Sequence, residues 1–205
     1  EMCIRDSYYP GVTEWFDAVN EYGKSKGVVI EHYIISSGLK KIIEGTEIAK
    51  NFCEIFASEF VYDEYGVPYW PAVALNYTSK IQFLYRINKG IFDVSDDKNL
   101  NDSMEERNRR IPFCNMIYIG DGLTDVPSMK VTRLNGGHSI GVYADEQENA
   151  RKMMKAGRIN FMAKADYTKD SELMRIVKRI VDMLAAENDL MELSLSQYDK
   201  SKENF

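Results

Sequence analysis

The sequence is poor in cysteine and histidine and has no long apolar run. Its three cysteines, Cys3, Cys53 and Cys114, are odd in number and widely spaced, and it has two histidines. Without a C-x-x-C pattern, this spacing favours neither a zinc site nor a disulfide framework. No apolar stretch approaches the roughly 18 residues that a membrane helix requires. We therefore expect a cytoplasmic protein with reduced thiols and no membrane partner.

Basic residues are also in the minority. The 205 residues include 32 acidic and 26 basic side chains, which gives a formal net charge of -6. An acidic balance disfavours a general nucleic-acid-binding surface, so no nucleic-acid partner is expected. With 44% apolar residues, a chain of this length can bury one substantial core, which favours one domain with a small insertion.

Helical and strand patterns alternate along the chain. The β-branched runs predict strands and the amphipathic stretches predict helices. Strands are expected at 28–38, 54–58, 115–120, 139–143 and 160–164, and helices at 12–26, 39–50, 78–90, after Pro127, at 146–155 and at 171–186. This order predicts an α/β fold, a Rossmann-like and mainly parallel sheet with helices on both faces.

One segment interrupts this alternation. Aromatic and β-branched residues flank a Tyr-Gly-Val-Pro turn, which predicts a small β-hairpin insertion at about 59–75. The expected organisation is a non-native or disordered leader at 1–8, a core at 9–187, and a polar C-terminal tail at 188–205 that frays.

Three polar side chains fall where such a sheet binds ligands, outside the carboxyl ends of its strands. Ser36 ends one predicted strand, Asp121 follows another, and Lys80 opens the helix after the hairpin. We expect these side chains to reach the same crevice.

The stretch "GDGLTD" is the most specific of these features. Asp121 and Asp125 are one helical turn apart, so both carboxylates can lie on one side of a turn, as a hard cation such as Mg2+ requires. Gly120 and Gly122 allow a close backbone approach. Magnesium held by one or two carboxylates takes phosphate or water oxygens as its other ligands. The pattern therefore indicates a phosphate substrate.

The phosphate-binding groups are expected at the other two positions. Ser36, Ser37 and Gly38 lie at a predicted strand-to-helix turn, where a hydroxyl and backbone N–H groups suit an anion. Lys80 adds a compact positive charge. Taken singly, a Ser-Ser-Gly turn is usually a helix cap and a lysine at a helix start is usually solvated, so the hypothesis rests on their conjunction with "GDGLTD".

These residues resemble three motifs of the haloacid dehalogenase (HAD) superfamily, in the same order: Ser36 after "HYII", Lys80 in "NYTSK" and "GDGLTD". The likeness is greatest to its phosphoserine-phosphatase-like members and covers roughly residues 10 to 185. It implies magnesium-dependent phosphoryl transfer through an aspartyl-phosphate. Ser36 would hydrogen-bond the phosphoryl group, Lys80 would balance charge, Asp121 would ligate Mg2+, and Asp125 would ligate the metal or orient the site. Ser36, Lys80 and Asp121 are thus the catalytic candidates.

The superfamily's first motif, an Asp-x-Asp at the end of a strand, has no counterpart here. Asp6 has no strand before it, and Asp17 lies within a predicted helix. The resemblance implies that the chain is N-terminally truncated. It would lack a central strand between those ending at Ser36 and Gly120, and with it the nucleophile, so the fragment would be inactive and poorly folded.

Two other functions remain open. A non-catalytic module that binds phosphate or a metabolite needs no nucleophile. A receiver-like signalling domain also gathers acids, Ser/Thr and Lys around magnesium, but in a different order along the chain. The expected ligand is a small phosphorylated metabolite, and the sequence indicates neither its identity nor the oligomeric state.

Overall fold

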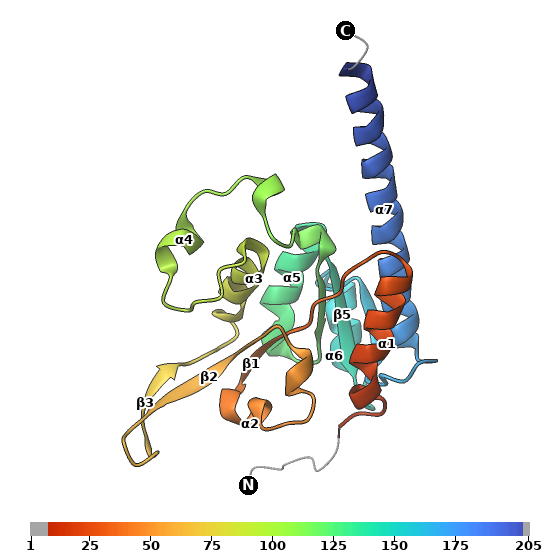
Figure 1. The fold of residues 1–205 in the computed structure, drawn as a ribbon. Coiled ribbons are helices and arrows are strands. Elements are labelled where there is room, and N and C mark those ends of the chain that lie inside the picture. The colour runs from red at the N-terminus through yellow and green to blue at the C-terminus, as the bar shows by residue number, and fades with distance from the viewer. Residues whose placement is uncertain (1–7, 203–205) are drawn as a thin grey trace. The chain divides into compact units, whose positions relative to one another are not determined.

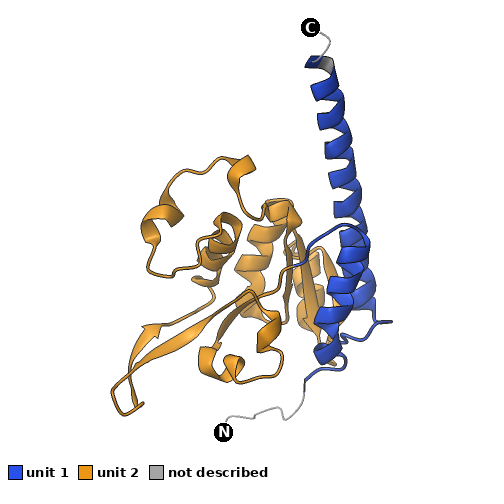
Figure 2. Cartoon of the chain, in the orientation of Figure 1, with its two compact units in different colours: residues 1–30, 166–205 blue, residues 31–165 orange. Residues whose placement is uncertain are grey.

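The computed structural model describes residues 8–202. They form two compact units, one of residues 8–30 and 166–202 and one of residues 31–165 (Figure 2). The boundaries at residues 30 and 165 divide the core expected at 9–187. The leader expected at 1–8 lies, apart from Tyr8, outside the described residues.

The first unit consists of α1 (Val12–Ser25) and α7 (Glu172–Lys202), joined by the segments that flank them (Figure 1). The predicted helix at 12–26 is confirmed, and its Trp15 is buried with the ring edge-on to Tyr167, the centroids 5.1 Å apart. Gly11 precedes α1 with φ of 79°, and a Cβ there would lie 2.5 Å from the Thr168 nitrogen. Only glycine lets the two segments approach this closely.

Helix α7 is longer than the sequence pattern predicts. The expected helix end near Ala186 is wrong, because the helix continues to Lys202. The fraying of the polar tail expected at 188–205 stays a prediction. Residues 186–202 contain neither Gly nor Pro and are rich in good helix formers, so exposure does not end the helix. Within residues 8–202 no helix, the 31-residue α7 included, is both long enough and apolar enough to cross a membrane.

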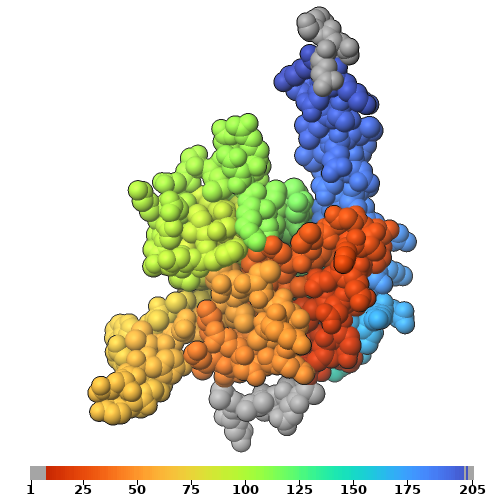
Figure 3. Space-filling view, viewed as in Figure 1, coloured from red at the N-terminus to blue at the C-terminus, as the bar shows by residue number. Residues whose placement is uncertain are grey.

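The first sheet of the second unit combines parallel and antiparallel pairing. Strand β1 (Tyr33–Leu39) runs parallel to the first half of β2 (Glu54–Tyr62), and β3 (Pro68–Val73) pairs antiparallel with the second half. The predicted hairpin is confirmed as a continuation of β2. It projects from the rest of its unit (Figure 3). Asp63 Oδ1 accepts the N–H groups of Tyr65 and Val67 and shapes its turn.

The second sheet is entirely parallel. Strands β4 (Ile117–Gly120), β5 (His138–Tyr143) and β6 (Phe161–Lys164) pair in chain order. Helix α5 (Val126–Leu134) packs on β4 and β5, and α6 (Glu148–Lys155) packs on β5 and β6. Parallel strands flanked by helices confirm the predicted α/β class.

The two sheets of this unit are not joined. Within residues 8–202, β1 and β4 each have one edge without a strand partner, where a single sheet was expected. These are the two strands between which the sequence analysis places a missing strand. Helix α3 (Lys80–Lys89) contacts β1 and packs against α5, so it links the two sheets.

The shared core of this unit lies around α3 and α5. Its centre consists of Phe56, Leu75, Phe83, Leu84, Ile87, Phe113, Met116, Tyr118, Val126, Met129, Met153 and Ile159. Short helices occupy the connections: α2 (Lys40–Glu44), α4 (Asp97–Asn101) and the 3-10 turns Ala49–Asn51, Glu106–Asn108, Phe113–Asn115 and Leu123–Asp125.

Candidate functional site

The turn after β4 is built around close contact between a glycine and a carboxylate. A Cβ on Gly120 would lie 2.8 Å from Asp125 Cγ, so glycine is required for Asp125 to fold back against the strand end. Gly122 N–H then donates to Asp125 Oδ2 at 3.3 Å. The close packing of this carboxylate therefore explains why "GDGLTD" begins with Gly120 and ends with Asp125.

Asp125 is buried, with 7% of its surface exposed, and three donors converge on it. Lys80 Nζ lies 2.7 Å from Oδ1, and the Tyr118 hydroxyl donates to the same oxygen at 2.8 Å. Burial, reinforced by the Asp125 charge, raises the pKa of Tyr118, so its hydroxyl remains a proton donor. The carboxylate is thus positioned to hold the lysine.

Lys80 is buried as well, with 6% exposure at the start of α3. A buried ammonium requires a paired counter-charge, which Asp125 supplies. The structure therefore brings together Lys80 and Asp125, two predicted residues that lie far apart in the sequence. Ser79, which precedes α3, does not cap the helix with its side chain; it bonds to the Asn76 backbone instead.

The Ser-Ser-Gly segment lies where the β1 ladder becomes irregular. Ile35 pairs with Phe56, but the next paired residue is Leu39, opposite Ser58. The Ser36 hydroxyl accepts the Gly38 N–H at 3.0 Å, which leaves its proton available for another acceptor. Ser37 and Gly38 are exposed. This local geometry can present a hydroxyl to an anion.

No hydrogen bond or ion pair between described residues joins Ser36 to Lys80, Asp121 or Asp125. Asp121 is exposed directly after β4 and makes no such bond with any described residue. The meeting of Ser36 and Asp121 with the Lys80–Asp125 pair therefore stays a prediction. Asp17 lies exposed within α1, as expected, and Asp6 is outside the described residues.

The carboxylates fit magnesium unequally. Asp121 has both oxygens available, whereas the oxygens of Asp125 already accept from Lys80, Tyr118 and Gly122. Within residues 8–202, no three His, Cys, Asp or Glu side chains group together as metal ligands. Asp121 can hold Mg2+ together with phosphate and water oxygens, while Asp125 fits the orienting role.

Tyr118 belongs to this site and was missed by sequence reasoning. Its position in the apolar strand "MIYIG", two residues before Gly120, made it resemble core packing. The available signal was the hydroxyl of a tyrosine in a strand that leads into an acidic turn, because a buried tyrosine usually finds a hydrogen-bond partner.

Comparison with known proteins gives one informative relative. No family model matches the chain. A protein of Borreliella burgdorferi described as an "Uncharacterized protein" is 29% identical over 187 residues, which is 81% of this chain. The match covers 64% of that relative's length, so the chain spans less than two thirds of it.

Proposed function

We propose that this chain is the phosphate- and magnesium-binding part of a phosphatase of the HAD superfamily that acts on a small phosphorylated metabolite. The observation that carries the proposal is the buried Lys80–Asp125 ion pair, 2.7 Å long, at the turn after β4. A lysine held beside the carboxyl end of a parallel strand is suited to balance the charge of a transferring phosphoryl group.

The other groups would act around this pair. Ser36 would donate its hydroxyl proton to a phosphoryl oxygen, assisted by the backbone N–H of the exposed Ser37. Asp121 would hold Mg2+, and the bound ion would neutralise part of the phosphate charge. Tyr118 would keep Asp125, and through it Lys80, in one orientation.

The chemical step needs a carboxylate nucleophile, and neither N-terminal candidate suits it. Asp17 is exposed in the middle of α1 and does not follow a strand in the chain. As part of the proposal, a nucleophile-bearing strand would pair with the open edges of β1 and β4. The 205-residue chain is accordingly proposed to bind phosphate without turning it over.

The test measures phosphate binding by calorimetry with and without Mg2+. Magnesium should tighten binding in the wild-type chain, and Asp121→Asn should remove this enhancement. Asp189→Asn, an equal change of charge on the exposed part of α7, should leave it unchanged. The absence of any tightening of phosphate binding by Mg2+ in the wild-type chain would contradict the proposal.

Turnover separates catalysis from simple binding. The 205-residue chain should hydrolyse p-nitrophenyl phosphate no faster than its Asp121→Asn variant, whereas a form extended upstream of Glu1 should do so with Mg2+. An extended form that binds phosphate but does not hydrolyse it would favour the non-catalytic module. That alternative already has one observation in its favour, because Asp17 lies within a helix and is not placed as a nucleophile. Activity of the short chain that is lost in Asp121→Asn would disprove its inactivity.

A further inference from the structure

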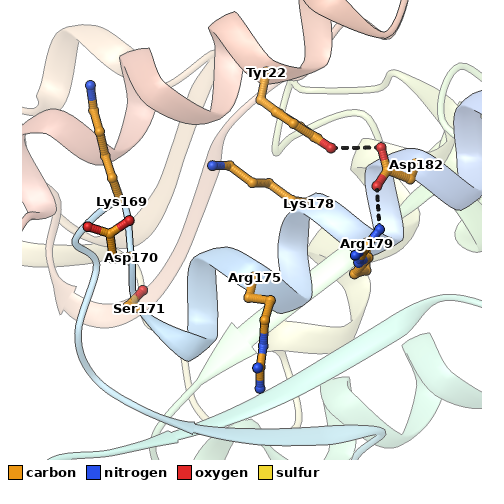
Figure 4. A pocket seen from close by; sticks show the side chains of 8 residues that line it. All are labelled: Tyr22, Lys169, Asp170, Ser171, Arg175, Lys178, Arg179 and Asp182. Carbon is orange, nitrogen blue, oxygen red and sulfur yellow. Dashed lines mark hydrogen bonds and ion pairs between the residues drawn. The ribbon is translucent and has the colours of Figure 1, made fainter.

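A polar pocket lies wholly within the first unit, between α1 and the start of α7. It has a volume of about 350 Å³ and is lined by Tyr22, Lys169, Asp170, Ser171, Arg175, Lys178, Arg179 and Asp182 (Figure 4). That volume falls within the roughly 300–1,000 Å³ typical of small-molecule sites. Four of the lining side chains are basic and two are acidic, in a chain whose net charge is -6.

One of the two acids is already neutralised by its neighbours. Asp182 accepts the Tyr22 hydroxyl at 2.7 Å, and its oxygens lie 3.1 Å from Lys26 and 3.4 Å from Arg179. These contacts lower the pKa of Asp182, with the Tyr22 hydrogen bond the largest cause. The carboxylate is therefore committed to fixing the pocket wall and has little charge left to repel an anion.

Two of the cations lack a counter-charge. Neither Lys169 nor Lys178 forms an ion pair with any residue in 8–202, and the Lys178 ammonium lies 5.2 Å from the centre of the Tyr22 ring. Figure 4 shows the Lys178 side chain pointing into the space between Tyr22 and Asp170. Both ammonium groups can therefore donate to a ligand.

The floor of the pocket adds a buried hydroxyl. Ser171 is 8% exposed, and its oxygen accepts the Met174 N–H at 3.1 Å as the cap of α7. Its proton has no acceptor within the described part of the chain. A buried hydroxyl proton without an acceptor at the positive end of a long helix favours a ligand that carries anionic oxygens.

We propose that this pocket binds a small phosphate-type dianion through Lys169, Lys178 and Ser171. A dianion with several acceptor oxygens can accept from the Lys178 ammonium and the Ser171 hydroxyl together. Figure 4 shows the exposed Lys169 side chain turned away from Ser171, so its ammonium joins the same ligand by rotation of the side chain. Free phosphate and the phosphate group of a small ester share this chemistry. The proposal concerns residues of the first unit only and is independent of the magnesium-binding proposal for Asp121.

The test titrates the full chain with inorganic phosphate and with phenyl phosphate, in EDTA and at low ionic strength. The Lys169→Gln/Lys178→Gln double variant should bind about tenfold more weakly or worse, as expected when charged hydrogen bonds are lost. Lys155→Gln, which removes an exposed lysine on α6, and Asp121→Asn should both bind as the wild type does. Tighter binding of one probe would identify the source of the phosphate group.

Two results would overturn this proposal: undiminished affinity in the double variant, or an equal loss in Lys155→Gln. If thermal melting shows that the double variant is unfolded, Lys169→Gln alone decides, because Lys169 is exposed in the segment before α7. That single variant should still weaken binding several-fold.

Discussion

Asp125 shows how much one residue's role depends on its surroundings. By sequence it pairs with Asp121 as a second acid one turn away. In the structure it is buried against Gly120, with Lys80 and Tyr118 on one oxygen. Two carboxylates four residues apart thus differ in environment, because one is exposed and the other balances a buried ammonium.

Removing the Asp125 charge should expose the cost of burying Lys80. We expect Asp125→Asn to lower the free energy of unfolding by about 3 to 5 kcal/mol, the usual result of leaving a buried charge unpaired. Urea denaturation followed by circular dichroism measures this. The double variant Lys80→Met/Asp125→Asn removes both charges and should recover much of the loss. A single variant as stable as the wild type would mean that the ion pair is solvated.

At the level of elements, the sequence pattern predicts whether a segment is a helix or a strand better than it predicts where the element begins and ends. The strand expected at 28–38 begins at Tyr33, and Val29 within it is 88% exposed. A β-branched sequence does not by itself supply a pairing partner, and β1 starts only where β2 lies beside it. In α7 the opposite occurs, since local helix propensity extends the helix beyond its buried face.

The two halves of α7 should differ in stability. Leu173 to Leu184 includes the buried apolar face, whereas every residue from 186 to 200 is exposed. Hydrogen exchange measured by mass spectrometry should show strong protection in the first half and weak protection in the second, because a helix without packing frays locally. Equal protection along the whole helix would show that a partner covers the second half in solution.

On the scale of the whole molecule, two half-buried histidines connect the fold to pH. Burial lowers the pKa of His32 from 6.5 to about 4, and burial also lowers that of His138. The unfolded chain therefore binds protons near its ordinary histidine pKa, while the folded chain does not. The contribution of these histidines to the free energy of unfolding is therefore fully present above the unfolded pKa. It is lost as the pH drops from that value towards the folded pKa.

For His32 this loss should reach about 2 to 3 kcal/mol between pH 6.5 and pH 4. Carboxylates titrate in the same window, so the measurement is the difference between wild type and His32→Gln. Urea denaturation across this range should give a shallower pH dependence for the variant. Parallel curves would show that the pKa of His32 does not differ between the folded and unfolded chains.

Much of the candidate site could be predicted, and the limits have physical causes. Lys80 and Asp125 stood out because each sits at a chain position where a parallel α/β sheet places its ligands. Tyr118 did not stand out, because a hydrogen bond from a strand tyrosine leaves no periodic signal. The pocket of the first unit gave no sequence signal either, because its residues come from α1 and from residues 169–182, which are far apart in the sequence.

The amino-acid sequence by itself determined the α/β class, the hairpin and the glycine-rich acidic turn, because these follow from local periodicity and backbone freedom. Only the tertiary structure decided that the strands form two sheets, that β2 serves both partners, and that Asp125 is paired with Lys80. Strand pairing and charge burial depend on contacts between distant segments, and the properties of neighbouring residues do not specify them.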